Sequence, residues 1–421
     1  MRDLAALDGT ELLAAYRNHA LSPREVVQDA LQRAEKANPK VNAFVLVDAD
    51  RATAAAKQSE DRWLRKQPRG LLDGLPFTIK DAINWAGHPN RGGSRLSPEG
   101  PVPENGPTVE DMLEAGAIPI GKTTLPEFGW KALGDSPLYG ITRNPWDTRL
   151  TSGGSSAGAG VAAALNLGVM HLGMDSAGSI RIPASFCGVF GLKPSHGRAP
   201  SSPPVPFALI SDIGPITRTV RDAALMLTVI AGPDPRDVWS LQTPPPDYRI
   251  GLKDGLRGFR IAWSPRLGFV DTLDPEVETI TAAAVRAFEE LGATVEQADP
   301  PWQDPIDTIR TIWRAGSWME LSSAPTERWK EADPGVVAFA EPGREMKASE
   351  FVSAANARSA LFKIMSEFHD RYDLLVTPTV ATTAFEVGHN TPPDGRFGEE
   401  WFKWAPYSYP FDLTLQPAAS V

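Results

Sequence analysis

Two short clusters of small and hydroxyl residues stand out: residues 153–158 (Gly-Gly-Ser-Ser-Ala-Gly) and residues 177–179 (Ala-Gly-Ser). Glycine lets a backbone turn tightly and bring N–H groups close to a ligand, and a serine hydroxyl can attack a carbonyl or relay a proton. A nucleophile beside converging N–H groups is what acyl transfer needs. Ordinary turns would explain one such cluster, but they explain less well two clusters that flank a hydrophobic segment.

Lys80 is a third candidate for chemistry. It follows residues 75–79 (Leu-Pro-Phe-Thr-Ile), which predict a buried strand. A lysine flanked by apolar residues at a strand end can be desolvated enough to lose its charge, and a neutral amine can accept a proton. Taken alone, such a lysine is more often structural than catalytic.

These segments together resemble the amidase signature family, whose members hydrolyse amides through a Ser, cis-Ser, Lys triad. The spacings between Lys80, Ser155 and Ser179 agree with those of the family. The resemblance is dense from residue 71 to residue 232 and sparse afterwards. The matching segments are residues 74–81, 121–129, 142–147, 153–158, 175–185, 187–194, 214–224, 373–379 and 416–421.

The resemblance implies a role for each of these three residues. Ser179 would attack the carbonyl carbon, and Ser155, preceded by a cis peptide bond, would pass the proton of Ser179 to an uncharged Lys80. Water would then hydrolyse the acyl-enzyme. The oxyanion would be held by the backbone N–H groups of four consecutive residues, Ser176, Ala177, Gly178 and Ser179. A charged pair, Asp175 and Arg181, would hold the loop rather than touch substrate.

The sequence departs from the family pattern in two respects. Many members carry glycine where this chain has Ala177, so the loop must avoid a positive φ at that position. The family also usually continues beyond the match to residues 416–421 with a further strand and helix. We therefore expect a chain that is short at its C-terminus, either truncated or without that layer.

Two other motifs point to different functions. Residues 116–123 satisfy the pattern of a nucleotide-binding P-loop, but residues 109–115 before them predict a helix rather than the required strand, which favours a chance match. Residues 154–158 satisfy the nucleophile elbow of α/β-hydrolases, with Ser156 as nucleophile and His369 or His389 as its partner. The polar residues before Ser156 are unlike a strand. An esterase of that type, or an inert binding protein with the amidase fold, is the alternative.

The pattern of segments predicts a single large α/β domain, with a mixed twisted β-sheet core covered by α-helices. Residues 1–70 predict N-terminal helices that wrap the domain, and residues 71–232 hold the signature core. Residues 233–421 would complete the domain and supply variable segments of the substrate pocket. Strands are expected at residues 169–174, 259–263, 294–297 and 374–377.

Composition limits location and partners. With 42% hydrophobic residues, 22% charged residues and a net charge of −10, the chain is typical of a soluble globular protein that binds neither nucleic acid nor a membrane. No signal peptide or apolar run of membrane-spanning length is evident, so we expect a cytoplasmic protein. One cysteine, Cys187, and six scattered histidines predict no intramolecular disulfide, no metal and no cofactor.

The substrate is constrained least. Aromatic residues cluster late in the chain and would form either core or a wall over an apolar substrate: Trp302, Trp313, Trp318, Trp329, Trp401, Phe402, Trp404, Tyr407 and Tyr409. We expect a small neutral or aromatic amide, with carbamates (urethanes) and esters also accepted because their carbonyls present the same geometry. A glutaminase subunit working with a transfer-RNA partner is less expected, and a homodimer is left open.

Overall fold

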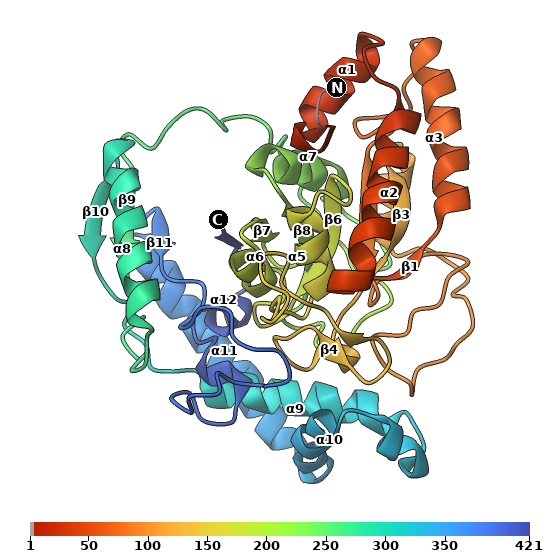
Figure 1. Ribbon diagram of the computed structural model, residues 1–421. Helices are drawn as coiled ribbons and strands as arrows, with labels where there is room; N and C mark the ends of the chain where they lie inside the picture. The colour runs from red at the N-terminus through yellow and green to blue at the C-terminus, as the bar shows by residue number, and fades with distance from the viewer. Residues whose placement is uncertain (1–3) are drawn as a thin grey trace.

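A seven-stranded mixed sheet forms the centre of the computed structural model, which describes residues 4–421 (Figure 1). The first three residues of the predicted N-terminal helical region lie outside the described residues. The strand order is β1-β3-β2-β6-β8-β7-β12, where β2 is parallel to β3 and β6 and the other pairs are antiparallel. The predicted mixed sheet is therefore confirmed. Its strands are β1 (Phe44–Val47), β2 (Pro76–Lys80), β3 (Ile118–Thr123), β6 (Met170–Asp175), β7 (Phe190–Lys193), β8 (Asp212–Thr217) and β12 (Ala418–Ser420).

Helices cover both faces of this sheet. One face packs on α5 (Ala157–Ala164) and α6 (Arg181–Cys187), and the other on α4 (Pro107–Glu114) and α7 (Val220–Ile230). The central strands β2, β3, β6 and β8 are buried along their whole length, which explains their nearly continuous apolar sequences. Small residues let α5 approach closely, since a Cβ on Gly158 would lie 2.1 Å from the carbonyl oxygen of Ala43.

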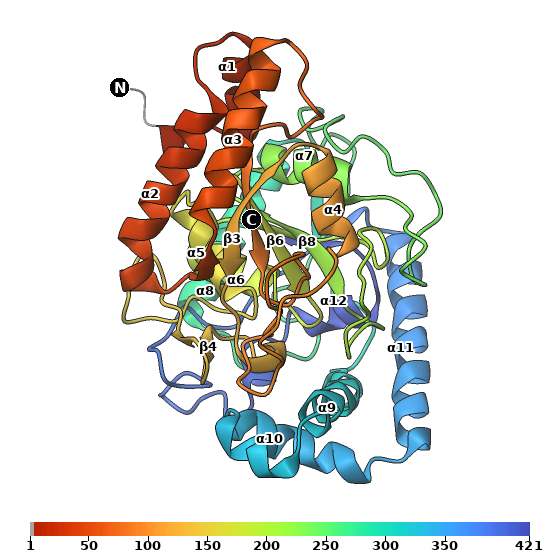
Figure 2. The ribbon, with the colours of Figure 1, turned by 90° about the vertical axis from the view of Figure 1, so that its right-hand side faces the viewer.

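The N-terminal region is helical, as predicted. It comprises α1 (Gly9–Arg17), α2 (Pro23–Val41) and α3 (Ala49–Leu64). Ser22 and Glu25 form a capping box at the start of α2, with Pro23 in the first turn. Figure 2 shows these three helices on one side of the molecule, away from α9 and α10. Among residues 4–421, no helix is both long enough and apolar enough to cross a bilayer.

A second, smaller sheet corrects one expectation. The strands predicted near residues 260, 295 and 375 do form, as β9 (Arg260–Trp263), β10 (Thr294–Gln297) and β11 (Leu374–Val376), but they do not join the central sheet. They form a separate parallel sheet in the order β10-β9-β11, packed against α8 (Pro275–Glu290). Residues 231–259 contain no helix or strand and carry the chain away from the central sheet, so these strands pair with one another (Figure 1).

The remaining elements pack around a large aromatic core. The longer helices are α9 (Ile306–Ser322), α10 (Pro334–Ala340), α11 (Ala348–His369) and α12 (Tyr409–Leu413). Short elements are η1 (Leu4–Ala6), η2 (Glu127–Gly129), η3 (Thr326–Glu331), η4 (Glu341–Glu345), η5 (Trp401–Lys403), β4 (Asp135–Ser136) and β5 (Gly140–Ile141). In Figure 2, α9 and α10 lie below the sheet, and α11 runs along its side. The core between these helices and the sheet includes Ala177 and Ile182, so it supports the second glycine-rich cluster.

Candidate active site

Lys80 ends strand β2 and is almost completely buried, with 2% of its surface exposed. Its Nζ lies 2.7 Å from Ser155 Oγ and donates to the Met174 carbonyl at 3.2 Å. Burial lowers the pKa of Lys80 to about 7, because removal from water disfavours the charged form, and the negative charge of Asp175 opposes this only in part. Much of Lys80 is therefore neutral near pH 7.

The carboxylate next to Lys80 in sequence is held by other groups. Asp81 forms a buried ion pair with Lys122, with 2.7 Å between Nζ and Oδ1, and the Tyr139 hydroxyl donates to Asp81 at 2.7 Å. Lys122 lies within strand β3 and also donates to the Pro89 carbonyl at 2.6 Å. Residues 118–123 are thus a buried strand rather than a phosphate-binding loop, and the chance-match interpretation of the P-loop pattern is confirmed.

Ser155 sits between the lysine and the second cluster. The Gly154–Ser155 peptide bond is cis, as the resemblance implied. Gly154 must be glycine, since a Cβ there would lie 2.1 Å from the carbonyl oxygen of Leu133. Gly129 has a positive φ of 68° and also approaches closely, since a Cβ on it would lie 3.2 Å from Ser155 Oγ. These contacts fix Ser155 beside Lys80.

Ser179 lies on the loop between strand β6 and helix α6, with 6% of its surface exposed. The Ser156 N–H donates to the Ser179 carbonyl at 3.0 Å, so the two glycine-rich clusters are joined directly. The Asp175 carboxylate accepts hydrogen bonds from the Gly178 and Ile180 N–H groups and from the Arg181 guanidinium. Asp175 and Arg181 therefore hold the loop, as expected.

Ser408 and Asp412, from the distant end of the chain, also hold this loop. The Ser408 hydroxyl donates to the Ala177 carbonyl at 2.7 Å. Arg181 donates to the Ser408 carbonyl at 3.0 Å and to the Asp412 carboxylate at 2.6 Å. The sequence analysis did not identify either residue, because no local pattern connects them to the loop.

The backbone N–H groups of the predicted oxyanion site are not equivalent. The Gly178 N–H already donates to Asp175. Within residues 4–421, the N–H groups of Ser176, Ala177 and Ser179 donate to no protein acceptor. The positive φ in this loop falls on Gly178, at 114°, and not on Ala177, which confirms the constraint expected for alanine.

A cavity of about 250 Å³ brings Lys80, Ser155 and Ser179 to one place. Its walls are mostly apolar, and its polar lining comes from few side chains besides these three. The apolar lining residues are Ala82, Leu125, Phe128, Met174, Pro203, Pro204, Val205, Pro206, Phe207 and Trp313. The other lining residues are Asn90, Gly92, Ser97, Gly129, Ser176 and Glu320.

Of the aromatic residues singled out in the sequence, Trp313 lines this cavity. Its ring stacks on Phe207 with centroids 4.2 Å apart, and its Nε1 donates to the Trp130 carbonyl at 2.9 Å. Most of the others are buried in the core, including Trp401 and Trp404. The structure adds Phe128, Phe207, Glu320 and residues 203–206, which the sequence analysis missed; the proline-rich tract was the one visible signal.

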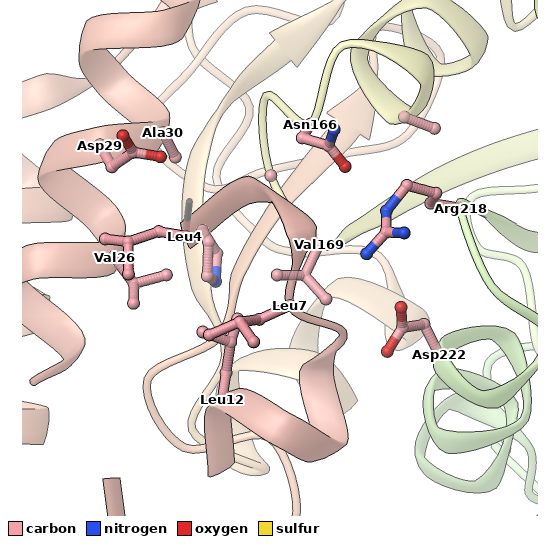
Figure 3. A pocket seen from close by; sticks show the side chains of 13 residues that line it. Leu4, Leu7, Leu12, Val26, Asp29, Ala30, Asn166, Val169, Arg218 and Asp222 are labelled. Atoms are coloured by element: carbon pink, nitrogen blue, oxygen red, sulfur yellow. The ribbon is translucent and has the colours of Figure 1, made fainter. Parts of the chain in front are cut away.

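Other hollows are separate from these residues. A hollow of about 30 Å³, seen in Figure 3, lies between the N-terminal helices and the side chains of Val169, Arg218 and Asp222. A third hollow of about 390 Å³ is lined by residues 269–272 and by part of the segment 396–409. Neither includes Lys80, Ser155 or Ser179 in its lining.

The nucleophile-elbow alternative finds no support in the geometry. Ser156 Oγ bridges the N–H and carbonyl of Met174, at 3.2 Å each, and does not line the cavity. Among the described residues, no histidine lines it either. His369 instead lies 2.9 Å from the carbonyl oxygen of Tyr372 through Nδ1.

Comparison with known proteins agrees with this site. The family model described as Amidase matches residues 25–421. The chain is 34% identical over 426 residues to an acylamidase from Rhodococcus erythropolis, covering 100% of this chain and 89% of that protein. It is 41% identical over 422 residues to the A-type subunit of the glutamyl-tRNA(Gln) amidotransferase from Anaeromyxobacter sp. (strain K), covering 93% of this chain and 84% of that protein.

Solved structures give the same result. A bacterial aryl acylamidase of the amidase signature family matches with a TM-score of 0.91 at 28% identity, covering 99% of this chain and 89% of that one. A peptide amidase from Stenotrophomonas maltophilia matches with a TM-score of 0.81 at 27% identity, covering 99% and 90%. The chain belongs to the amidase signature family. It is a hydrolase of carbon–nitrogen bonds in non-peptide amides.

Proposed function

We propose that this enzyme cleaves small neutral or aromatic amides with Ser179 as nucleophile, Ser155 as proton relay and Lys80 as base. The observation that carries the proposal is the 2.7 Å contact between Lys80 Nζ and Ser155 Oγ in a cavity that Ser179 also lines. A lysine kept partly neutral, a bridging hydroxyl and a second hydroxyl in one cavity are the parts that proton-assisted acyl transfer requires.

In the first half of the reaction, Ser179 Oγ bonds to the substrate carbonyl carbon while its proton passes to Ser155. The proton of Ser155 passes to the neutral amine of Lys80, which becomes ammonium. The oxyanion is bound by the free N–H groups of the loop, from Ser176, Ala177 and Ser179, while the Gly178 N–H chiefly holds Asp175. This narrows the set of four donors predicted from the sequence.

In the second half, the tetrahedral intermediate collapses and the carbon–nitrogen bond breaks. Ser155 gives its proton to the leaving amine and recovers one from Lys80. Water then adds to the ester carbonyl of the acyl-enzyme, passing its proton along the same route, and the carboxylic acid leaves Ser179. Proton transfer of this kind contributes roughly 10²- to 10⁴-fold to the rate.

The cavity lining supports the choice of substrate. Its apolar walls, with Phe128, Phe207 and Trp313, suit an aromatic or aliphatic group. The described lining contains no arginine, and its one lysine is Lys80. A substrate with a free carboxylate, such as glutamine, would therefore find no dedicated cation, which favours an acylamidase over part of an amidotransferase. Carbamates and esters offer the same carbonyl to Ser179.

A hydrolysis assay tests this function. Acetanilide and 4-nitrophenyl acetate would be offered to the wild type, to Ser179→Ala and to the control Ser185→Ala, which alters a serine outside the cavity lining. We expect turnover by the wild type and the control, and none above background by Ser179→Ala. Turnover that survives Ser179→Ala, or a wild type inactive on every acyl donor, contradicts the proposal. The cytoplasmic location and the homodimer stay predictions.

A further inference from the structure

Glu320 is the one carboxylate in the described lining of the catalytic cavity. It lies on helix α9, two turns beyond Trp313, and because residues seven apart share a helix face, both side chains reach the same cavity. Between them, Gly316 lets Phe207 pack against the helix, since a Cβ at Gly316 would lie 2.3 Å from Phe207 Cε1. The aromatic wall and the carboxylate are therefore parts of one surface.

The Glu320 carboxylate has no partner among residues 4–421. It enters no ion pair and accepts no hydrogen bond, although it is half-buried. Nearby carboxylates are paired: Glu331 binds Arg328 at 2.9 Å, and Asp333 binds Lys131 at 3.1 Å. Burial without a neighbouring cation raises the pKa of Glu320 above its ordinary value.

An unpartnered carboxyl group in a mainly apolar cavity is costly for the free protein. That cost is offset when a ligand supplies the missing donor. A cationic nitrogen does so best, because hydrogen bonds between charged groups are shorter and stronger than neutral ones. Around the cavity, the other ionisable lining group is Lys80, which is largely neutral when it acts as base. The cavity thus favours a positive group and disfavours a negative one.

We propose that Glu320 selects amides that carry an ammonium group away from the scissile bond, binding that group while the substrate carbonyl lies at Ser179. This rests on the proposed function and narrows its substrate class to amides of amino-substituted acids or of diamines. Glu320 acts here as a specificity residue that binds the substrate without taking part in proton transfer.

Paired substrates that differ by one charge test the inference. One pair varies the acyl half: 6-aminohexanoyl anilide against heptanoyl anilide, in which a methyl group replaces the ammonium. The other varies the amine half: the acetamides of 4-(aminomethyl)aniline and 4-ethylaniline. We would measure kcat/KM for both pairs in the wild type, in Glu320→Gln and in the control Glu327→Gln, which changes an exposed glutamate of the next segment.

We expect the wild type and the control to prefer the cationic member of at least one pair by about tenfold or more, as a charge-assisted hydrogen bond would give. Glu320→Gln should bring that preference close to unity and leave kcat/KM for the neutral member within about threefold. An unchanged preference in Glu320→Gln, or no preference in the wild type, overturns the inference. A wild type that cleaves neither neutral amide instead refutes the proposed function, so the two failures are distinguishable.

A measurement on the wild type alone covers the case in which Glu320→Gln does not fold. Benzylamine and benzyl alcohol would be compared as competitive inhibitors of neutral anilide hydrolysis at pH 8. The inference predicts that benzylammonium binds about tenfold more tightly than the alcohol. Equal inhibition constants would contradict it.

Discussion

The Asp81 carboxylate lies 2.7 Å from the Lys122 ammonium, and both side chains are buried, with Asp81 next in sequence to the proposed base, Lys80. This ion pair gives the charge of Asp81 a partner of its own, together with the Tyr139 hydroxyl. Lys80 is left to contact Ser155 and a backbone carbonyl instead of a carboxylate. The arrangement explains how a buried lysine stays partly neutral beside an aspartate in sequence.

Lys122→Met should therefore destabilise the protein strongly. It would leave the Asp81 carboxylate buried without its cation, which typically costs about 3–5 kcal/mol. In the double variant Asp81→Asn/Lys122→Met, we expect much of this loss to be recovered, because no charge is then left unpaired. Urea unfolding of the single and double variants measures both; equal losses in the two would show that the pair is not coupled.

Activity should rise with pH through the titration of Lys80. Its pKa is lowered to about 7 by burial, so the protonated form dominates below pH 7 and cannot accept the proton of Ser155. For a neutral anilide, we expect kcat/KM to increase about tenfold per pH unit well below pH 7 and to level off above it. A pH profile that is flat from pH 5 to pH 9 would contradict the role of Lys80.

The same shift has a consequence for stability. Unfolded lysine has a pKa of about 10.4, so between about pH 7 and pH 10 the unfolded state binds more protons at Lys80 than the native state does. The contribution of Lys80 to the free energy of unfolding therefore increases with pH across this window. We expect Lys80→Met to be more stable than the wild type near pH 6, with the difference shrinking towards pH 10, as measured by denaturant unfolding.

Gly178 and Ala177 form a matched test of the loop. Gly178 has a φ of 114°, and a Cβ there would lie 2.5 Å from Ser408, whereas the φ of Ala177 is not positive. Gly178→Ala should displace the neighbouring N–H groups and lower kcat by about 100-fold or more, the scale of losing an oxyanion donor. Ala177→Gly should change kcat far less. Similar effects of both changes would argue against this loop as the oxyanion site.

Arg181 links the loop to the end of the chain, and its loss should be severe. It bonds Asp175 at 2.9 Å and Asp412 at 2.6 Å, with both carboxylates buried. Arg181→Met would leave two buried carboxylates without their cation and should cost about 3–5 kcal/mol of unfolding free energy. Arg181→Met/Asp412→Asn should lose less, and thermal unfolding of both variants would show whether it does.

The sequence carried much of this site but not all of it. Lys80, Ser155 and Ser179 were identified because short motifs of glycine, serine and lysine sit beside predicted strands and match a known family. The loop conformation at Ala177 followed from the steric limits of alanine. These features depend on local sequence, and so local sequence could predict them.

Features that depend on tertiary contact were missed. Glu320 lies on a helix whose pattern is ordinary, and it becomes a cavity residue when α9 packs on Phe207. Asp412 meets Arg181 across most of the chain. The second sheet was also missed as a separate unit, because strand propensity gives the strands β9, β10 and β11 without saying which neighbours they pair with.

Labelling with a serine-reactive fluorophosphonate, followed by intact mass and peptide mapping, tests the central claim most directly. It would be run on the wild type and on Lys80→Ala. The account predicts one stoichiometric adduct, on Ser179, that forms far more slowly when Lys80 is replaced. An adduct on Ser156, or labelling of Ser179 at the same rate in both proteins, would contradict it.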